Sequence, residues 1–172
     1  ILDSPRAAYL LWKLIREKDF FSILNSGINN DDPTAQFIWY GLQKLGYDNR
    51  LTEQDALTLL EKSAAQNHLP AIIELGYNYY AGKYVAEDKN KGVQLWNYAK
   101  ENRSIEAKVR LAVSKIYDFK FADSLSEEVR ILRESEANGS LLAQFTLGYC
   151  YEKGIVLKKS LPEAVKFYRA AA

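Results

Sequence analysis

The chain has 172 residues, a formal net charge of +1 and 48% hydrophobic residues, so it has enough apolar side chains to bury a core. This charge gives no electrostatic reason to expect a nucleic acid or an anionic membrane as partner. No apolar run approaches the ~20 residues that a membrane-spanning helix needs, which argues against direct membrane insertion. The single cysteine, Cys150, excludes an internal disulfide.

The first 32 residues predict a helical hairpin that serves as an N-terminal cap or a partial repeat. Ser4-Pro5 is typical of a helix start, and a helix is expected from residue 6 to about residue 18. A second helix should begin at Asp19 and end at Gly27. The first helix is expected to bury Ala8, Leu11, Trp12 and Ile15.

From Asp32-Pro33 onward, similar residues return every 36 positions. Each repeat predicts two helices whose apolar faces cannot be buried within one repeat, and this pattern indicates a stacked solenoid. We therefore expect an all-α, right-handed α-α superhelix of about five antiparallel helix pairs, with the hairpin at 1–32 followed by four repeats at 33–172, the last of them truncated. The repeating positions include an alanine column (Ala35, Ala71, Ala107, Ala143), a second-helix column (Leu60, Trp96, Leu132, Tyr168) and predicted helix N-caps (Thr52, Asp88, Ser124, Ser160).

Glycines mark two further features of the repeat. Gly76 lies between large residues of a first helix, where the missing side chain would let another helix approach closely, and it aligns with Tyr40, Ala112 and Gly148. A second set, at the expected ends of the first helices, should terminate them. It consists of Gly46, Gly82 and Gly154, with Asp118 at the same place in the third repeat.

The pattern A-x-x-x-L-G-x-x-Y-x-x-G, followed by a loop and A-x-x-[WY]-x-x-A, resembles the Sel1-like repeat, a relative of the tetratricopeptide repeat with a longer loop between its helices. The first and third repeats are degenerate versions of it. The resemblance implies an adaptor that binds other proteins, and some members of the family are thought to act as immunity proteins against toxins. The second repeat matches through Ala71, Leu75, Gly76, Tyr79, Gly82, Trp96 and Ala99, and the fourth through Ala143, Leu147, Gly148, Tyr151, Gly154, Ala164, Tyr168 and Ala171.

Few residues in the sequence could carry catalysis. The single histidine, His68, lies at an expected turn between repeats, and Cys150 lies in the middle of an expected helix, where a small buried residue is the simpler interpretation. Acidic pairs such as Glu127-Glu128 fit helix starts and solvated faces, as do Asp31-Asp32 and Glu134 with Glu136. We therefore expect no enzymatic activity, no metal and no cofactor.

A second set of apolar positions on the first helices predicts a binding surface. These positions lie two and six residues after the repeat alanine, on a face turned away from the alanine column, and in tetratricopeptide-like repeats the first helices line the concave side. We interpret them as a groove for an extended or helical segment of another protein. The alternative is that the earlier position packs against the neighbouring hairpin. The predicted binding residues are Phe37, Ile73, Tyr77, Val109, Phe145 and Tyr149 at these positions, together with Tyr80.

The predicted function is thus a non-enzymatic scaffold or adaptor that works within a larger complex. The alternatives are a carbohydrate- or peptidoglycan-associated module, whose aromatic residues would stack on sugars, and an immunity-type inhibitor of a toxin. Sugar stacking needs exposed tryptophans, whereas Trp12, Trp39 and Trp96 all fall near core columns, which favours the scaffold. The chain starts at Ile1, lacks Met and stops inside a repeat helix, so we expect a piece of a longer protein.

Overall fold

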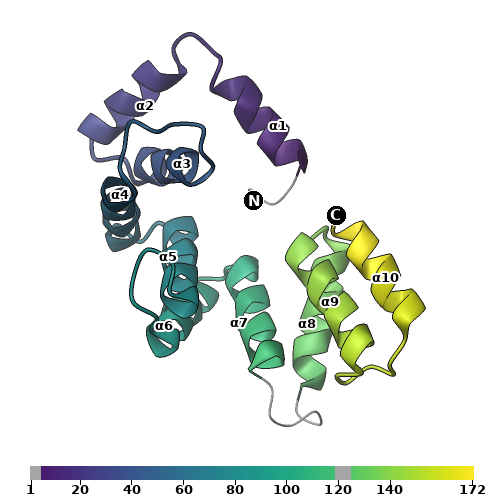
Figure 1. Ribbon diagram of the computed structural model, residues 1–172. Coiled ribbons are helices and arrows are strands. Elements are labelled where there is room, and N and C mark those ends of the chain that lie inside the picture. The colour runs from purple at the N-terminus through teal and green to yellow at the C-terminus, as the bar shows by residue number, and fades with distance from the viewer. Residues whose placement is uncertain (1–4, 119–124) are drawn as a thin grey trace. The chain divides into compact units, whose positions relative to one another are not determined.

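The computed structural model describes residues 5–118 and 125–172, and in these residues it contains ten α-helices and no strand (Figure 1). The all-α prediction is therefore confirmed. In chain order, the helices are α1 (Pro5–Leu14), α2 (Phe20–Asn29), α3 (Pro33–Lys44), α4 (Glu53–Ala65), α5 (Leu69–Ala81), α6 (Lys89–Glu101), α7 (Ile105–Tyr117), α8 (Ser126–Ala137), α9 (Leu141–Lys153) and α10 (Leu161–Ala170).

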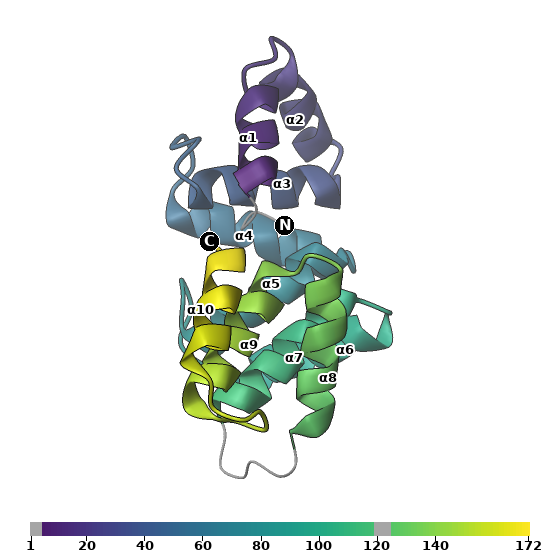
Figure 2. The ribbon, with the colours of Figure 1, turned by 90° about the vertical axis from the view of Figure 1, so that its right-hand side faces the viewer.

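The contacts between helices divide the chain into two compact units, residues 1–102 and residues 103–172. In the first unit, α2 packs on α3, α3 on α4, α4 on α5 and α5 on α6. In the second unit, α7 packs on α8, α8 on α9 and α9 on α10, and α7 also contacts α9 (Figure 2). Each helix thus packs mainly against its neighbours in sequence, as expected for a helical repeat fold.

The alanine column forms the centre of the packing in each unit. Ala71, Ala107 and Ala143 are fully buried, and Ala35 is 5% exposed. A methyl group at this place allows neighbouring helices to approach closely, which explains why no larger residue occurs in any of the four repeats. The cores around the column contain Leu57, Leu60 and Leu75 in the first unit, and Val129, Leu132 and Leu147 in the second.

The turn that precedes each first helix has the same backbone conformation in all four repeats. Asp31, Asn67, Arg103 and Gly139 are spaced 36 residues apart, and each has a positive φ, between 56° and 84°. This left-handed conformation suits Gly, Asn and Asp, but it is strained for Arg. The period seen in the sequence is therefore also a period of backbone geometry.

Large and small side chains fit together inside the hairpins. A Cβ atom added to Gly76 would lie 2.7 Å from Trp96 Nε1, and one added to Gly148 would lie 2.8 Å from the Tyr168 ring. Trp96 is 2% exposed, and its Nε1 donates a hydrogen bond of 3.0 Å to the carbonyl oxygen of Ile73. The predicted close approach at Gly76 is confirmed: the space left by the glycine holds the indole ring of the second helix.

The loops that follow α5 and α9 also share one geometry. Gly82 and Gly154 have φ values of 63° and 76° and cap these helices in the left-handed conformation, as predicted. Two residues later, Tyr84 and Val156 again have positive φ values, of 62° and 60°. Gly46, with φ of 71°, follows the end of α3, whereas Asp118 ends α7 with φ of −80°.

Side-chain caps fix the starts of several helices. The Asp32 carboxylate accepts a hydrogen bond from Thr34 N at 2.8 Å at the start of α3, and Thr52 and Asp55 form a capping box on α4. Asp88 and Ser160 cap α6 and α10, while the predicted cap Ser124 lies outside the described residues. Ser104 and Ser140, which were not predicted as caps, cap α7 and α9.

The N-terminal hairpin differs from its prediction at three places, the first of which is that α1 ends at Leu14 rather than near residue 18. Trp12 is 39% exposed rather than buried, and its ring contacts side chains near it in sequence: it stacks on Tyr9, and the Arg16 guanidinium lies 3.9 Å from its centroid. Gly27 does not end α2, which continues to Asn29. A Cβ atom at Gly27 would lie 2.6 Å from Ala35 Cβ, so this glycine serves the close approach of α3.

Replacing the indole in the second repeat should destabilise the first unit. We expect Trp96→Ala to lower the free energy of unfolding by about 3–5 kcal/mol, because it empties the space beside Gly76 and removes the hydrogen bond to Ile73. Trp96→Phe keeps most of the ring and should cost about 1–2 kcal/mol, chiefly through the lost hydrogen bond to the Ile73 carbonyl oxygen. Urea denaturation measures both values, and equal losses for the two variants would contradict this packing.

Relieving the backbone strain at Arg103 should stabilise the protein. We expect Arg103→Gly to raise the free energy of unfolding by about 0.5–1 kcal/mol, since relief of the left-handed strain exceeds the extra chain entropy of glycine. The matched control is Lys108→Gly, on the exposed side of α7, which should cost about 1 kcal/mol because the helical backbone there is unstrained. Thermal denaturation should show a higher melting temperature than wild type for Arg103→Gly and a lower one for Lys108→Gly.

Candidate functional site

The seven predicted binding residues do not share one environment. Phe145 is 49% exposed, and Phe37, Tyr77, Tyr80 and Tyr149 are partly buried. The expectation that the whole stripe faces water is wrong for the other two, Ile73 and Val109, which are 7% and 1% exposed.

The position two residues after the repeat alanine therefore serves packing in the middle repeats. Val109 belongs to the same core as Ala112, Val129 and Leu147, which is the alternative that the sequence left open. Tyr80 also turns toward its own hairpin, since its ring lies 5.0 Å from that of Trp96. The accessible part of the predicted stripe is consequently found at Phe37 and Tyr77 in the first unit and at Phe145 and Tyr149 in the second.

Four rings gather on the surface of the second unit, and we call them the aromatic patch: Tyr117, Phe145, Tyr149 and Tyr168. The Tyr117 and Tyr149 ring centroids are 4.7 Å apart, and those of Phe145 and Tyr168 are 5.1 Å apart. Phe145 and Tyr149 lie one turn apart on α9, while Tyr117 comes from the end of α7 and Tyr168 from α10. Nearly half of Tyr117 and of Phe145 is exposed, so the patch offers two apolar rings to a partner.

Two phenols of the aromatic patch, those of Tyr117 and Tyr168, are held in their neutral form. Burial raises the pKa of Tyr117 and of Tyr168 above the ordinary value for tyrosine, and the nearby Glu152 carboxylate adds to the effect at Tyr168. Tyr168 Oη donates a hydrogen bond of 2.8 Å to Glu152 Oε2. Glu152 in turn forms an ion pair of 2.5 Å with Lys153. The patch is therefore apolar with a small, internally neutralised polar edge.

The sequence pointed to only half of the aromatic patch. Tyr168 was assigned to a packing column, which is correct for one side of its ring, and Tyr117 follows no repeating aromatic position. The corresponding residues in the other repeats are Leu45, Ala81 and Lys153. The long aromatic side chain at the end of a first helix was the available signal for Tyr117.

In the first unit, polar side chains join the first helices of two successive repeats. Tyr40 on α3 donates a hydrogen bond of 3.1 Å to Glu74 Oε1 on α5 and accepts one of 3.2 Å from Asn78 Nδ2. Lys44 also forms an ion pair with Glu74. Burial, together with the Glu74 charge, raises the pKa of Tyr40 far above its ordinary value, so Tyr40 remains a hydrogen-bond donor.

His68 is the residue before the first turn of α5, as its predicted turn position implied, and its side chain makes no capping hydrogen bond. Its ring lies 5.4 Å from that of Phe37, a predicted binding residue. Partial burial lowers the pKa of His68, while the charge of Asp32 opposes that shift. The Phe37 ring is therefore partly covered by a neutral imidazole at neutral pH.

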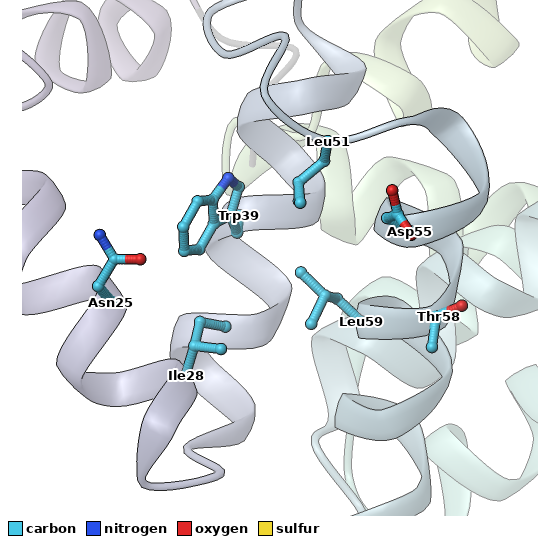
Figure 3. A pocket seen from close by; sticks show the side chains of 7 residues that line it. All are labelled: Asn25, Ile28, Trp39, Leu51, Asp55, Thr58 and Leu59. Atoms are coloured by element: carbon cyan, nitrogen blue, oxygen red, sulfur yellow. The ribbon is translucent and has the colours of Figure 1, made fainter.

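A shallow hollow of about 330 Å³ opens between α2, α3 and α4 of the first unit (Figure 3). Beside it, the loop after α3 is held by Arg50, whose side chain binds the Asp48 carboxylate through Nε at 2.8 Å and Nη2 at 2.7 Å. The Arg50 guanidinium also lies 4.2 Å from the Phe21 ring. The hollow is lined by four apolar side chains and three polar ones, which are Ile28, Trp39, Leu51 and Leu59, and Asn25, Asp55 and Thr58.

The residues with catalytic potential are placed as structural groups. Cys150 is fully buried, which raises the pKa of its thiol to about 11 and confirms the interpretation as a small core residue. Glu127 is exposed and pairs with Arg130, but Glu128 is not solvated as expected. It is 5% exposed, because it turns toward α7 and pairs with Lys115 at 2.6 Å.

Within residues 5–118 and 125–172, no group of three or more His, Cys, Asp and Glu side chains is arranged to hold a metal ion. None of the described helices combines the length and the apolar composition needed to span a membrane.

Comparison with protein families finds the Sel1 repeat at residues 35–68, 69–104 and 141–172, which together make up more than half of the chain. In the intervening repeat, which was expected to be degenerate, α7 and α8 still pack against each other. A mouse protein described as DAP3-binding cell death enhancer 1 is 34% identical over 87 residues, which are 49% of this chain and 16% of that protein.

Two solved structures share the fold. A Sel1 repeat protein from Oxalobacter formigenes superposes with a TM-score of 0.68 and 17% identity, over 96% of this chain and 68% of that one. A protective antigen of uropathogenic Escherichia coli strains that displays an SLR fold gives a TM-score of 0.64 and 22% identity, over 89% of this chain and 33% of that one. At these identities the likeness shows the fold alone. The chain spans only about a sixth of the mouse relative and a third of the E. coli antigen.

The ion pair of Arg50 with Asp48 beside the hollow, which we call the clasp, should make the stability of the first unit depend on pH. Hydrogen bonds from Arg50 lower the pKa of Asp48, so the stabilisation is complete above the ordinary aspartate pKa of about 3.9 and is lost as pH falls below it. Asp48→Asn should therefore cost about 1–2 kcal/mol at neutral pH and progressively less at acidic pH.

Urea denaturation from neutral pH to below the ordinary aspartate pKa of about 3.9 measures whether the free energies of unfolding of wild type and Asp48→Asn converge. Asp19→Asn is the control, since Asp19 is exposed and makes no capping hydrogen bond at the start of α2. A constant difference between wild type and Asp48→Asn at every pH would contradict the role of the clasp.

Proposed function

Because the chain belongs to the Sel1 repeat family, whose members generally serve as protein–protein interaction modules, we propose that it is a non-enzymatic scaffold that binds a segment of another protein. Each unit offers its own proposed contact surface: Tyr77 on α5 in the first unit, and the aromatic patch in the second. The chain would hold this segment as part of a larger complex.

The observation that carries this proposal is the aromatic patch. Half-exposed aromatic rings are a frequent centre of protein interfaces, because each ring buries a large area at a small cost in side-chain entropy. Phe145 and Tyr117 are exposed, yet each lies against a second ring that is more deeply buried. Such supported rings are positioned before a partner arrives, which reduces the entropy lost on binding.

The arrangement of the patch suits an extended or helical peptide segment. Its rings come from α7, α9 and α10, and two of them lie one helical turn apart, so the apolar surface continues across neighbouring helices. A segment that presents apolar side chains at regular intervals could contact several of these rings at once. The name of the mouse relative describes it as binding DAP3; for this chain, that name supports protein binding as a class and no particular partner.

The tryptophans make the sugar-binding alternative less suitable. Trp39 and Trp96 are 8% and 2% exposed, so neither can stack on a sugar ring. Trp12 is more exposed, but the Arg16 guanidinium covers one side of its ring. A toxin-inhibiting role would be one form of the proposed protein binding and would use the same surfaces.

Substitution at the patch should weaken partner binding without unfolding the protein. The partner is first identified by affinity capture and mass spectrometry with the full-length protein, and its binding to recombinant variants is then measured by calorimetry. We expect Phe145→Ala to weaken binding by ~1–3 kcal/mol, because it removes an exposed contact residue, and to change the melting temperature little.

The matched control is Ile105→Ala, since Ile105 is 66% exposed on α7 and lies outside the patch. It should leave both binding and stability close to the wild-type values. Full affinity of the Phe145→Ala variant for a verified partner would contradict the proposed surface.

A further inference from the structure

Two lysine side chains approach the same tyrosine ring on the first unit. Lys44 Nζ lies 5.7 Å from the centroid of the Tyr77 ring, and Lys83 Nζ lies 5.6 Å from it. Tyr77 is also one of the predicted binding residues, on the accessible side of α5. A partner segment that contacts this ring would therefore meet two ammonium groups beside it.

The two lysines differ in how their charges are balanced. Lys44 is paired with Glu74, which also accepts the hydrogen bond of Tyr40, so its charge is largely satisfied within the protein. Lys83 is exposed and forms no ion pair with any described residue. The Tyr77 surface consequently carries an uncompensated positive charge on Lys83.

The backbone places Lys83 firmly beside the ring. Gly82 ends α5 in the left-handed conformation, and Lys83 N donates a hydrogen bond of 2.9 Å to the carbonyl oxygen of Asn78, one residue after Tyr77. The Cα atom of Lys83 is thus fixed by the helix cap, and only the side chain has to be ordered when a ligand binds. Such a fixed starting point lowers the entropy cost of forming an ion pair.

In the fourth repeat, the equivalent tyrosine has no unpaired lysine among the described residues beside it. Tyr149 aligns with Tyr77, and Lys153 Nζ lies 5.8 Å from its centroid. There, however, Glu152 pairs with Lys153 at 2.5 Å. Each tyrosine thus has one lysine that is paired within the protein, Lys44 with Glu74 and Lys153 with Glu152. Tyr77 has a second lysine beside it, Lys83, and the equivalent residue in the fourth repeat is Ile155.

We propose that Lys83, above the Tyr77 ring, binds a carboxylate of the partner segment, and this inference rests on the proposed function. The ammonium group would donate a charge-assisted hydrogen bond to the carboxylate, while the ring contacts the neighbouring apolar part of the segment. Both an Asp or Glu side chain and a C-terminal carboxylate have this chemistry.

Selection from peptide libraries tests the inference without knowledge of the partner. The probes are two libraries of random linear peptides, one with free C-terminal carboxylates and one with amidated C-termini, selected on the intact chain. We expect enriched peptides to contain an excess of Asp and Glu in the amidated library if side chains supply the group. Enrichment in the free-acid library alone would identify the C-terminal carboxylate as the source.

The variants assign the effect to Lys83. Lys83→Gln should weaken binding of an enriched peptide about two- to fivefold and reduce its dependence on salt, because one exposed ion pair is removed. The matched control is Lys62→Gln, which removes an exposed lysine from α4 and should leave the affinity unchanged. Chemical shifts of the Lys83 side chain should also respond to the peptide in the wild-type protein.

Two outcomes would overturn the inference. One is enrichment of peptides without an excess of carboxylates and with equal affinity for the wild-type and Lys83→Gln proteins. The other is recovery of no peptide that perturbs Tyr77 or Lys83. Neither outcome affects the proposed function, because that proposal is tested independently at Phe145 in the second unit.

Discussion

The fold depends on close contact between the two helices of each hairpin, at a position where the side chains of the two helices share a limited volume. In the second repeat, Gly76 leaves room for the Trp96 indole, and in the fourth repeat Gly148 leaves room for the Tyr168 ring. In the third repeat, the small residue is Ala112 and the residue across from it in the repeat is Leu132, both in one buried core. Where the side chain on the first helix is smaller, the one on the second helix is larger, so the interior of each hairpin stays filled.

In the first repeat, the same balance of side-chain sizes leads to hydrogen bonds between successive repeats. Tyr40 occupies the glycine position there, and it lies in one core with Leu60, which is much smaller than tryptophan. The tyrosine hydroxyl extends beyond its own hairpin and contacts Glu74 and Asn78 on α5. A packing position thus becomes a polar link between successive repeats, and the Glu74 carboxylate that it orients also neutralises Lys44 beside Tyr77.

Most of the fold could be predicted from the sequence, because its main determinants are local. A cap such as Asp88, a left-handed glycine such as Gly82 and the alanine at each 36-residue step act through backbone geometry or through contacts with adjacent residues in the chain. Gly27 was misassigned because a glycine can either end a helix or permit a close contact. Only the position of Ala35 in space shows which of these roles it has.

The candidate site was less predictable, since exposure depends on which face the next hairpin covers. Ile73 and Phe145 are equivalent in the repeat, yet one is 7% exposed and the other 49%. The pairing of Tyr117 with Tyr149 joins residues that are far apart in the sequence and follow no shared repeat position. Periodicity indicates which residues are equivalent, but it does not give the rotation of each helix relative to its neighbours.

The same aromatic residues contribute to stability and to the accessible surface, and this arrangement follows from the repeat. A ring that packs between hairpins on one side can remain open to solvent on the other, as Tyr168 supports Phe145 and Tyr149 supports Tyr117. The supporting ring restricts the exposed ring, so a partner that binds there has less side-chain entropy to remove. Substitutions at the supporting rings should consequently affect folding and binding together, whereas Phe145, at the exposed end of its pair, allows the two effects to be measured separately.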